Sequence, residues 1–129
     1  KNKKGNNGWV LLTKEAYSVI DSMPEPEEGG LIFPYNSKSV TTLFQRYREK
    51  AGYAFIDKDE NLKFHDLRHE GISWLAEKNG LSEENWDIPR LQLVSGHKDW
   101  NVLQRYVNLL TAEPTDRWAN WEWKEKVLC

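Results

Sequence analysis

Residues 64–73 read Phe64-His65-Asp66-Leu67-Arg68-His69-Glu70-Gly71-Ile72-Ser73. His65, Arg68 and His69 are spaced i, i+3 and i+4, so a helix presents all three side chains on one face. We expect this helix to begin near His65 and to run to about Asn79, where Gly80 ends it. A helical face with two imidazoles and a guanidinium is the strongest chemical signal in the sequence.

Three interpretations of this helical face are open. It can be an ordinary solvated surface paired with carboxylates such as Glu70, because short motifs often occur without function. It can also be a zinc-dependent hydrolase site, since His65 and His69 have the spacing of H-E-x-x-H, with Asp66 in place of the glutamate. The shorter carboxylate and the fixed charge of Arg68 both disfavour that metal site. The third interpretation adds residues from further along the chain.

A second informative stretch reads Ser95-Gly96-His97-Lys98-Asp99-Trp100 and leads to Leu103-Gln104-Arg105-Tyr106. Pro89 and Gly96 fit the first turn and the end of a helix over residues 88–95. Tyr106 follows His97 by nine residues. It lies on a predicted helix that Asp99 caps and that can fold back toward the histidine.

Four of these residues form a set with its own chemistry. His65, Arg68, His97 and Tyr106 supply one fixed cation, two hydrogen-bonding imidazoles and a phenol. Such a set suits attack on a phosphodiester, because arginine matches the geometry of phosphate oxygens and tyrosine can form a covalent intermediate without a metal ion. For Tyr106 the alternative is a packing role, since Leu103, Val107 and Leu110 share its helical face.

The rest of the chain predicts a mainly helical fold with a small N-terminal sheet, an α+β arrangement. A turn signal at residues 5–8 precedes the apolar residues 9–12, which indicates the second strand of a β-hairpin. Residues 31–34 are expected to be extended. Further helices are expected after three positions, namely Thr13, Ser37 or Ser39, and Pro114.

Size and composition restrict the class of protein. The chain has 129 residues, which suffices for a single domain over residues 1–129. No apolar run approaches the roughly 20 residues that a membrane-spanning helix needs. The single cysteine, Cys129, cannot form an intramolecular disulfide, which is typical of a reducing compartment.

The formal net charge of −2 argues against binding nucleic acid through bulk charge. The placement of the charges changes that inference, because most acidic residues fall in predicted loops. Cations on or beside the two motif stretches include Lys63, Arg68, Lys98 and Arg105. Since phosphate affinity depends on which cations reach the backbone, the net charge does not exclude DNA.

Residues 64–73 and 95–106, in this order, resemble the tyrosine recombinase family of phage-type integrases. The likeness covers most of the chain, with specific motifs after residue 64 and weaker ones before it. It implies a recombinase catalytic-domain fold and site-specific DNA recombination or integration. It also implies double-stranded DNA with a specific site as partner, a homo-tetramer on that DNA, no cofactor or metal ion, no membrane, and a cytoplasmic, nucleoid-associated location.

The resemblance also implies a role for each site residue. Tyr106 would attack the scissile phosphate to form a 3′-phosphotyrosyl link, while Arg68 would hold the non-bridging oxygens. His65 would act as an acid/base or hydrogen-bonding group, and His97 would hydrogen-bond the phosphate. The family uses a hairpin lysine as general acid to the leaving 5′-oxygen. Counting back from Val10 favours Lys3, with Lys1 and Lys4 as alternatives.

The family's first catalytic arginine and its core-binding region would precede this hairpin, so we expect a C-terminal fragment that is nearly inactive alone. The tryptophan-rich tail, residues 113–129, predicts a helix. It either packs on its own domain or docks in a neighbouring protomer. A catalytically silent DNA-binding or interaction domain of recombinase shape is a further alternative for the whole chain.

Overall fold

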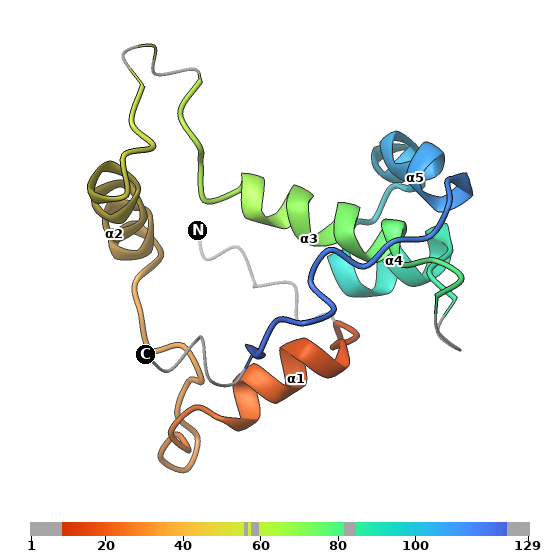
Figure 1. Cartoon of the computed structure of the whole chain (residues 1–129). Coiled ribbons are helices and arrows are strands. Elements are labelled where there is room, and N and C mark those ends of the chain that lie inside the picture. Colours follow the sequence, from red (N-terminus) through yellow and green to blue (C-terminus); the bar gives the residue numbers. More distant parts are fainter. Residues whose placement is uncertain (1–8, 56, 58–59, 82–84, 124–129) are drawn as a thin grey trace. The chain divides into compact units, whose positions relative to one another are not determined.

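The computed structural model describes residues 9–55, 57, 60–81 and 85–123. The chain divides into unit 1, Lys1–Met23 with Gly71–Cys129, and unit 2, Pro24–Glu70. The division falls inside helix α3 (Asp66–Glu77), which Figure 1 shows with the other helices. The expected single domain over residues 1–129 stays a prediction. No helix in the described ranges is long and apolar enough to cross a membrane.

Unit 1 contains most of the helices, several of which begin at side-chain caps. They are α1 (Lys14–Asp21), α4 (Ile88–Ser95), the 3-10 helix η1 (Trp100–Tyr106) and α5 (Val107–Thr111), besides most of α3. The Thr13 hydroxyl accepts the Ala16 amide at 3.1 Å, as expected for the cap of α1. The bounds of α4 are those predicted, and Gly96 ends it in the left-handed conformation at φ 68°.

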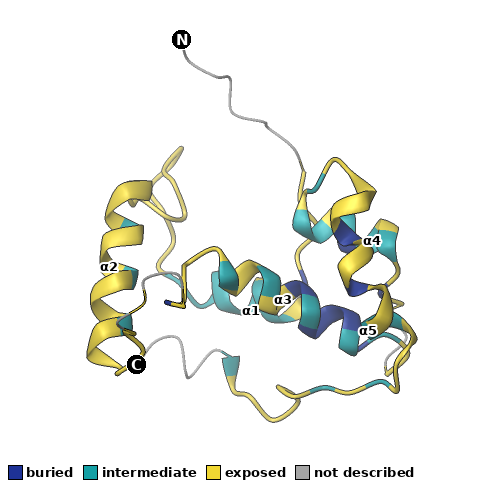
Figure 2. Ribbon diagram, turned by 90° about the horizontal axis from the view of Figure 1, so that it is seen from above, coloured by how far each residue is buried: buried dark blue, intermediate teal, exposed yellow. Residues whose placement is uncertain are grey.

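The hydrophobic core lies in unit 1, where one face of α3 meets α4 and η1. Its buried members are Ile72, Trp74, Leu75, Ala76, Trp86, Leu91, Leu103 and Tyr106. Figure 2 shows this burial on the later part of α3, whereas α2 is largely exposed. The core therefore fixes the α4–η1 segment, which carries the second motif stretch, against the later turns of α3.

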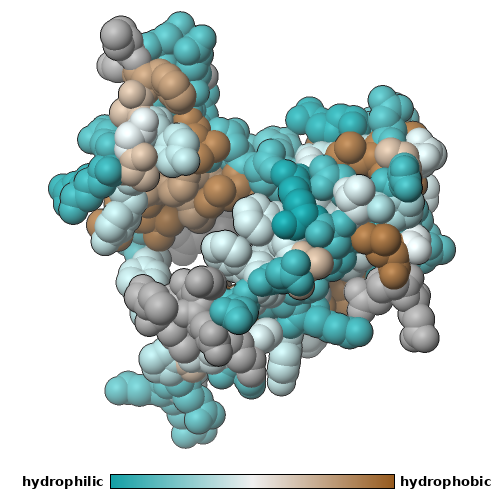
Figure 3. All heavy atoms as spheres, viewed as in Figure 1, coloured by the Kyte–Doolittle hydropathy of each residue, from teal (hydrophilic) through white to brown (hydrophobic). Residues whose placement is uncertain are grey.

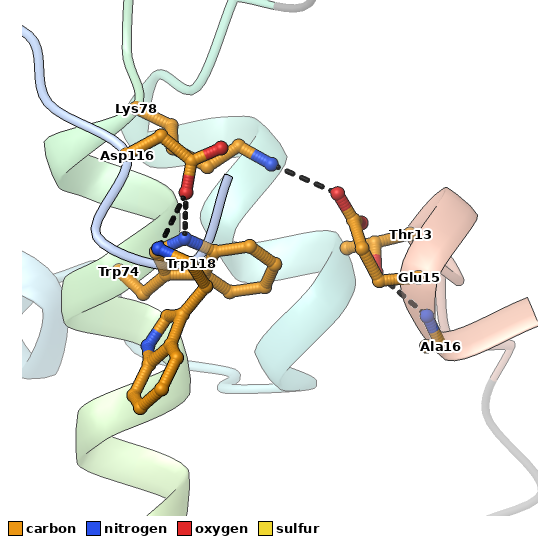
Figure 4. Close-up of polar contacts among 7 residues, drawn as sticks. All are labelled: Thr13, Glu15, Ala16, Trp74, Lys78, Asp116 and Trp118. Carbon is orange, nitrogen blue, oxygen red and sulfur yellow. Dashed lines mark hydrogen bonds and ion pairs between the residues drawn. The ribbon is translucent and has the colours of Figure 1, made fainter. Parts of the chain in front are cut away.

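Helix α3 is tied to α1 by a shielded ion pair (Figure 4). The Lys78 ammonium lies 3.0 Å from the Glu15 carboxylate and 4.3 Å from the centroid of the Trp74 ring. Burial opposes ionisation of Glu15, but hydrogen bonds from its own backbone and from Lys78 outweigh it and hold the pKa of Glu15 below its usual value. The pair therefore stabilises the folded state when Glu15 is ionised.

The described tail residues pack back on α3, which is one of the two arrangements expected for the tail. Trp74 Nε1 donates to Asp116 Oδ1 at 2.8 Å (Figure 4), and the Thr115 amide donates to the Glu77 carbonyl at 2.9 Å. Arg117 forms a two-point ion pair with Glu77, at 3.0 and 3.1 Å. The Trp74 and Trp123 ring centroids lie 5.2 Å apart.

Unit 2 is organised by α2 (Ser37–Lys50) and the loop that follows it. The Phe44 and Phe64 rings meet edge to face at 5.6 Å, and Arg48 Nη1 donates to the Leu62 carbonyl at 2.9 Å. The buried Asn61 amide accepts the Phe55 N–H and donates to two carbonyls, which closes the loop. These contacts set the chain path that leads into His65.

Many apolar side chains of unit 2 are exposed, and brown surface covers much of the α2 region in Figure 3. Among its described residues only Asn61 is buried. Examples of the exposed apolar residues are Leu31, Phe33, Tyr35, Tyr47 and Phe55. Unit 2 is therefore held by edge contacts and hydrogen bonds rather than by a core of its own.

The predicted N-terminal β-hairpin is wrong for the residues that can be compared. Residues 9–12 and 31–34 form no strand, and the described part of the chain contains none. The Leu11 amide instead donates to the Leu93 carbonyl near the end of α4, at 3.1 Å. The other half of the expected hairpin lies outside the described residues.

Three helix predictions need correction as well. Asn36, rather than Ser37 or Ser39, caps α2, since its side chain accepts the Lys38 amide at 2.9 Å. The helix capped by Asp99 is first a 3-10 helix and becomes an α-helix only at Val107. The expected tail helix is absent from residues 113–122, where the Asp116 carboxylate accepts the Trp118 amide and turns the chain.

Replacing Glu15 with glutamine is expected to destabilise unit 1 at neutral pH by about 1–3 kcal/mol, because Lys78 loses its charged partner while buried. The folded pKa of Glu15 is lowered, so its stabilisation is present above the ordinary glutamate pKa of about 4.3 and is lost as the pH falls through the folded value. Urea unfolding of wild type and Glu15→Gln at several pH values measures this difference. Glu113→Gln, at an exposed glutamate of the same unit, is the control, and an equal loss there would contradict the ion pair.

Replacing Asp116 with alanine is expected to loosen the tail, because the buried Trp74 indole loses its acceptor. The free energy of opening at the Thr115 amide should fall by about 1–3 kcal/mol. Hydrogen exchange of that amide is the measurement, with Glu122→Ala as the exposed control. Unchanged protection in Asp116→Ala would show that this carboxylate does not hold the tail.

Candidate active site

The first motif stretch enters α3 through a turn, and its two histidine side chains lie together. His65 immediately precedes α3, and the Arg68 amide donates to its carbonyl at 3.1 Å. The His65 and His69 rings meet edge to face with centroids 5.0 Å apart, which confirms that they share a face. His65 and Arg68 are both exposed. This places an imidazole and a guanidinium at the solvent-facing start of one helix, where they can contact an anion.

Asp66 has a structural role, which the sequence did not reveal. Its Oδ2 accepts the Lys63 amide at 2.6 Å, and its own amide donates to the Lys63 carbonyl at 2.9 Å. The carboxylate thereby fixes the turn before α3 instead of standing in for the glutamate of H-E-x-x-H. Across the described ranges, no three histidine, cysteine or acidic side chains are grouped as a metal ion requires. Because Asp66 Oδ2 is engaged by the Lys63 amide in this turn, the zinc-dependent hydrolase is not favoured.

The second motif stretch holds His97 in a closed turn after α4. His97 Nδ1 lies 2.8 Å from Ser95 Oγ, and the same hydroxyl accepts the His97 amide at 3.4 Å. Gln92 closes the turn, because its carbonyl accepts the Gly96 amide and its side chain donates to the Lys98 carbonyl. The imidazole is half-buried. Sequence reasoning missed Ser95, although a serine two residues before a histidine across a helix-ending glycine is a readable signal.

Tyr106 is the last residue of η1 and lies in the core of unit 1, with 3% of its surface exposed. Leu91, Leu103 and Ile72 belong to the same buried cluster. The packing role that its helical face predicts is thus confirmed. A nucleophilic role would in addition require the phenol to become accessible.

The four candidate residues divide between the two units. His65 and Arg68 belong to unit 2, and His97 and Tyr106 belong to unit 1. Lys3, with its alternatives Lys1 and Lys4, lies outside the described residues.

The chain belongs to the phage integrase family, whose model matches residues 2–113. The matched range contains both motif stretches, so the family assignment includes His65, Arg68, His97 and Tyr106.

Two curated relatives are similar to most of this chain. The shufflon-specific DNA recombinase of Escherichia coli is 29% identical over 107 residues, which cover 83% of this chain and 25% of that protein. A protein of Haemophilus influenzae named as an integrase/recombinase is 31% identical over 103 residues, 79% of this chain and 30% of its own length. The chain thus spans 25–30% of the length of these relatives. No solved structure gives a significant match.

The burial of Tyr106 predicts how two substitutions differ. Tyr106→Ala removes a core ring and is expected to cost about 3–5 kcal/mol, whereas Tyr106→Phe keeps the ring and should cost about 0.5–1.5 kcal/mol. Urea unfolding followed by circular dichroism measures both. Tyr17→Ala is the control, since Tyr17 in α1 is exposed and its removal should stay within about 0.5 kcal/mol. Equal effects of Tyr17→Ala and Tyr106→Ala would contradict the core position.

Proposed function

We propose that this chain is the C-terminal part of the catalytic domain of a site-specific tyrosine recombinase that cuts and rejoins double-stranded DNA. The match of the family model over residues 2–113, which includes all four described candidate residues, carries the proposal. Two relatives named as recombinases support the same reaction class. Exposed cations at the start of α3 are compatible with a phosphate partner.

In the proposed reaction, Tyr106 loses its phenolic proton to a base, a role considered for His65, its oxygen attacks the scissile phosphorus, and the bond to the 5′-oxygen breaks. The DNA 3′ end becomes linked to the enzyme through phosphotyrosine, and the departing 5′-oxygen takes up a proton. Lys3 is the proposed donor of that proton. Arg68 would stabilise charge on the non-bridging oxygens, because a guanidinium matches them with two N–H groups.

The two histidines have supporting roles in this proposal. His65 would act as an acid/base or hydrogen-bonding group, since it stands exposed beside Arg68 at the start of α3. His97 would hydrogen-bond the phosphate from the closed turn after α4. Tyr106, in contrast, is enclosed in the core, so attack requires this residue at the η1–α5 junction to expose its phenol.

The proposed partner is DNA carrying a specific recombination site, bound by a homo-tetramer. The packing of the tail bears on how such a tetramer could form. The described tail residues pack on α3 of the same chain. An exchange of the tail between protomers would first have to break the Trp74–Asp116 and Glu77–Arg117 contacts. Tetramer formation that survives a cut at Pro114 would exclude the tail as the connector.

The test captures the covalent intermediate on whatever DNA sequence the protein cuts. Cells express the complete encoded polypeptide, its DNA is recovered under denaturing conditions, and the attached fragments are sequenced. The wild type is expected to give a covalent adduct at one recurrent sequence, with a free 5′-hydroxyl on the other strand end. Tyr106→Phe should abolish the adduct, while Tyr17→Phe, at an exposed tyrosine, should retain it.

Two results would contradict the proposal. An adduct that persists in Tyr106→Phe would assign the nucleophile to another residue. Specific DNA binding without any adduct, with Tyr106 intact, would instead favour a catalytically silent DNA-binding domain.

A further inference from the structure

A single side-chain amide in the turn after α3 binds both ends of the segment 86–110. Asn79 Oδ1 accepts the Trp86 backbone amide at 2.8 Å, and Asn79 Nδ2 donates to the Leu110 carbonyl at 3.1 Å. A backbone amide can only donate and a carbonyl can only accept, so these two partners determine which way the side-chain amide points. The segment between them contains α4, η1 and Tyr106.

Both partners of Asn79 need a hydrogen bond from outside their own element. Trp86 is buried, with 1% of its surface exposed, and a buried amide without an acceptor is costly. The carbonyls in the last turn of a helix have no donor within that helix. Four residues beyond Leu110 stands Pro114, which has no amide hydrogen to offer. Asn79 therefore supplies an acceptor just before α4 and a donor near the end of α5.

The contact with Leu110 acts on Tyr106 through α5. Tyr106 directly precedes this helix, and in the proposed reaction its phenol has to leave the core. Helix α5 has five residues, none of them buried, and it packs against the core through the half-buried Leu109 and Leu110. Because this packing is limited, the hydrogen bond to Leu110 is a substantial part of what holds α5 in place.

We propose that Asn79 is a positioning residue that holds the η1–α5 junction closed over Tyr106, and that release of the Leu110 carbonyl exposes the phenol. This opening is local, because the packing of α3 against α4 is retained. The consequence for catalysis rests on the proposed function, whereas the effect on the exposure of Tyr106 does not.

Nitration of the folded chain by tetranitromethane, mapped by mass spectrometry, measures the exposure of Tyr106. Asn79→Asp is the test variant, because it keeps an oxygen for the Trp86 amide but replaces the donor to Leu110 with a second oxygen. The nitration rate of Tyr106 is expected to rise about 2- to 10-fold, the effect of one lost hydrogen bond. Asn79→Ala, which loses both hydrogen bonds, should raise the rate at least as much.

Two control variants should leave the nitration rate of Tyr106 at the wild-type value. Asn108→Asp is the matched control, since Asn108 is exposed on α5 and the same change in charge leaves the Leu110 contact intact. Thr13→Ala removes the cap of α1 and so lowers the stability of unit 1 without touching α5. Its unchanged rate would separate the role of Asn79 from a general loss of stability.

Low concentrations of urea distinguish local opening from unfolding. Local opening exposes little surface, so the Tyr106 rate in the wild type should stay nearly constant below the unfolding transition. A wild-type rate that rises with urea as steeply as global unfolding would overturn the proposal. An unchanged Tyr106 rate in a folded Asn79→Asp would overturn it as well.

The covalent-adduct assay tests the consequence for the reaction. Asn79→Asp is expected to raise the adduct yield about 2- to 10-fold, because the nucleophile is exposed more often. A yield at or below that of the wild type would overturn the role of Asn79 in the reaction. Faster nitration of Tyr106 in Asn79→Asp without any wild-type adduct would refute the recombinase reaction and leave the Asn79 contact standing.

Discussion

The burial of one face of α3 is the constraint on which the rest of unit 1 depends. Ile72, Leu75 and Ala76 are almost completely enclosed, and they belong to one cluster with Leu91 of α4 and Leu103 of η1. Burying large aliphatic side chains of this kind contributes about 1.5–3 kcal/mol each relative to exposure. The segments that carry His97 and Tyr106 are thereby fixed against the later turns of α3.

Trp74 extends this arrangement beyond the core. Its indole binds Asp116 of the tail, the Lys78 ammonium lies over its ring, and Lys78 in turn pairs with Glu15 of α1. One side chain therefore links α3 to segments from both ends of the described chain. The tail and α1 are stabilised through polar contacts to α3 rather than through much buried surface of their own.

The elements that could be predicted from the sequence are those set by local signals. Pro89 and Gly96 predicted the two ends of α4, and the i, i+4 spacing predicted that His65 lies beside His69. The prediction of the β-hairpin was wrong because strand pairing depends on residues elsewhere in the chain. The Leu11 amide donates to the Leu93 carbonyl instead. Residues 113–122 form no helix for a similar reason, since Asp116 binds Trp74, far away in sequence.

The residues of the candidate site likewise include some that local sequence signals predict and some that they do not. His65, Arg68, His97 and Tyr106 could be selected from spacing and chemistry, and the family assignment includes all four positions. Spacing could not reveal that Asp66 fixes the turn into α3 or that Ser95 contacts His97, because both depend on backbone reversal at a turn. The burial of Tyr106 could be predicted only as an alternative to its nucleophilic role, from the apolar residues on its helical face.

The central claim is that the candidate nucleophile is a core residue, and the reactivity of its phenol tests this most directly. The chain has five tyrosines, and those at positions 17, 35, 47 and 53 are exposed. Nitration of the folded chain, mapped by mass spectrometry, should modify these four readily and Tyr106 at least about tenfold more slowly, because its reaction requires local opening. In urea all five should react alike. Equal reactivity of Tyr106 in the folded chain would contradict the account.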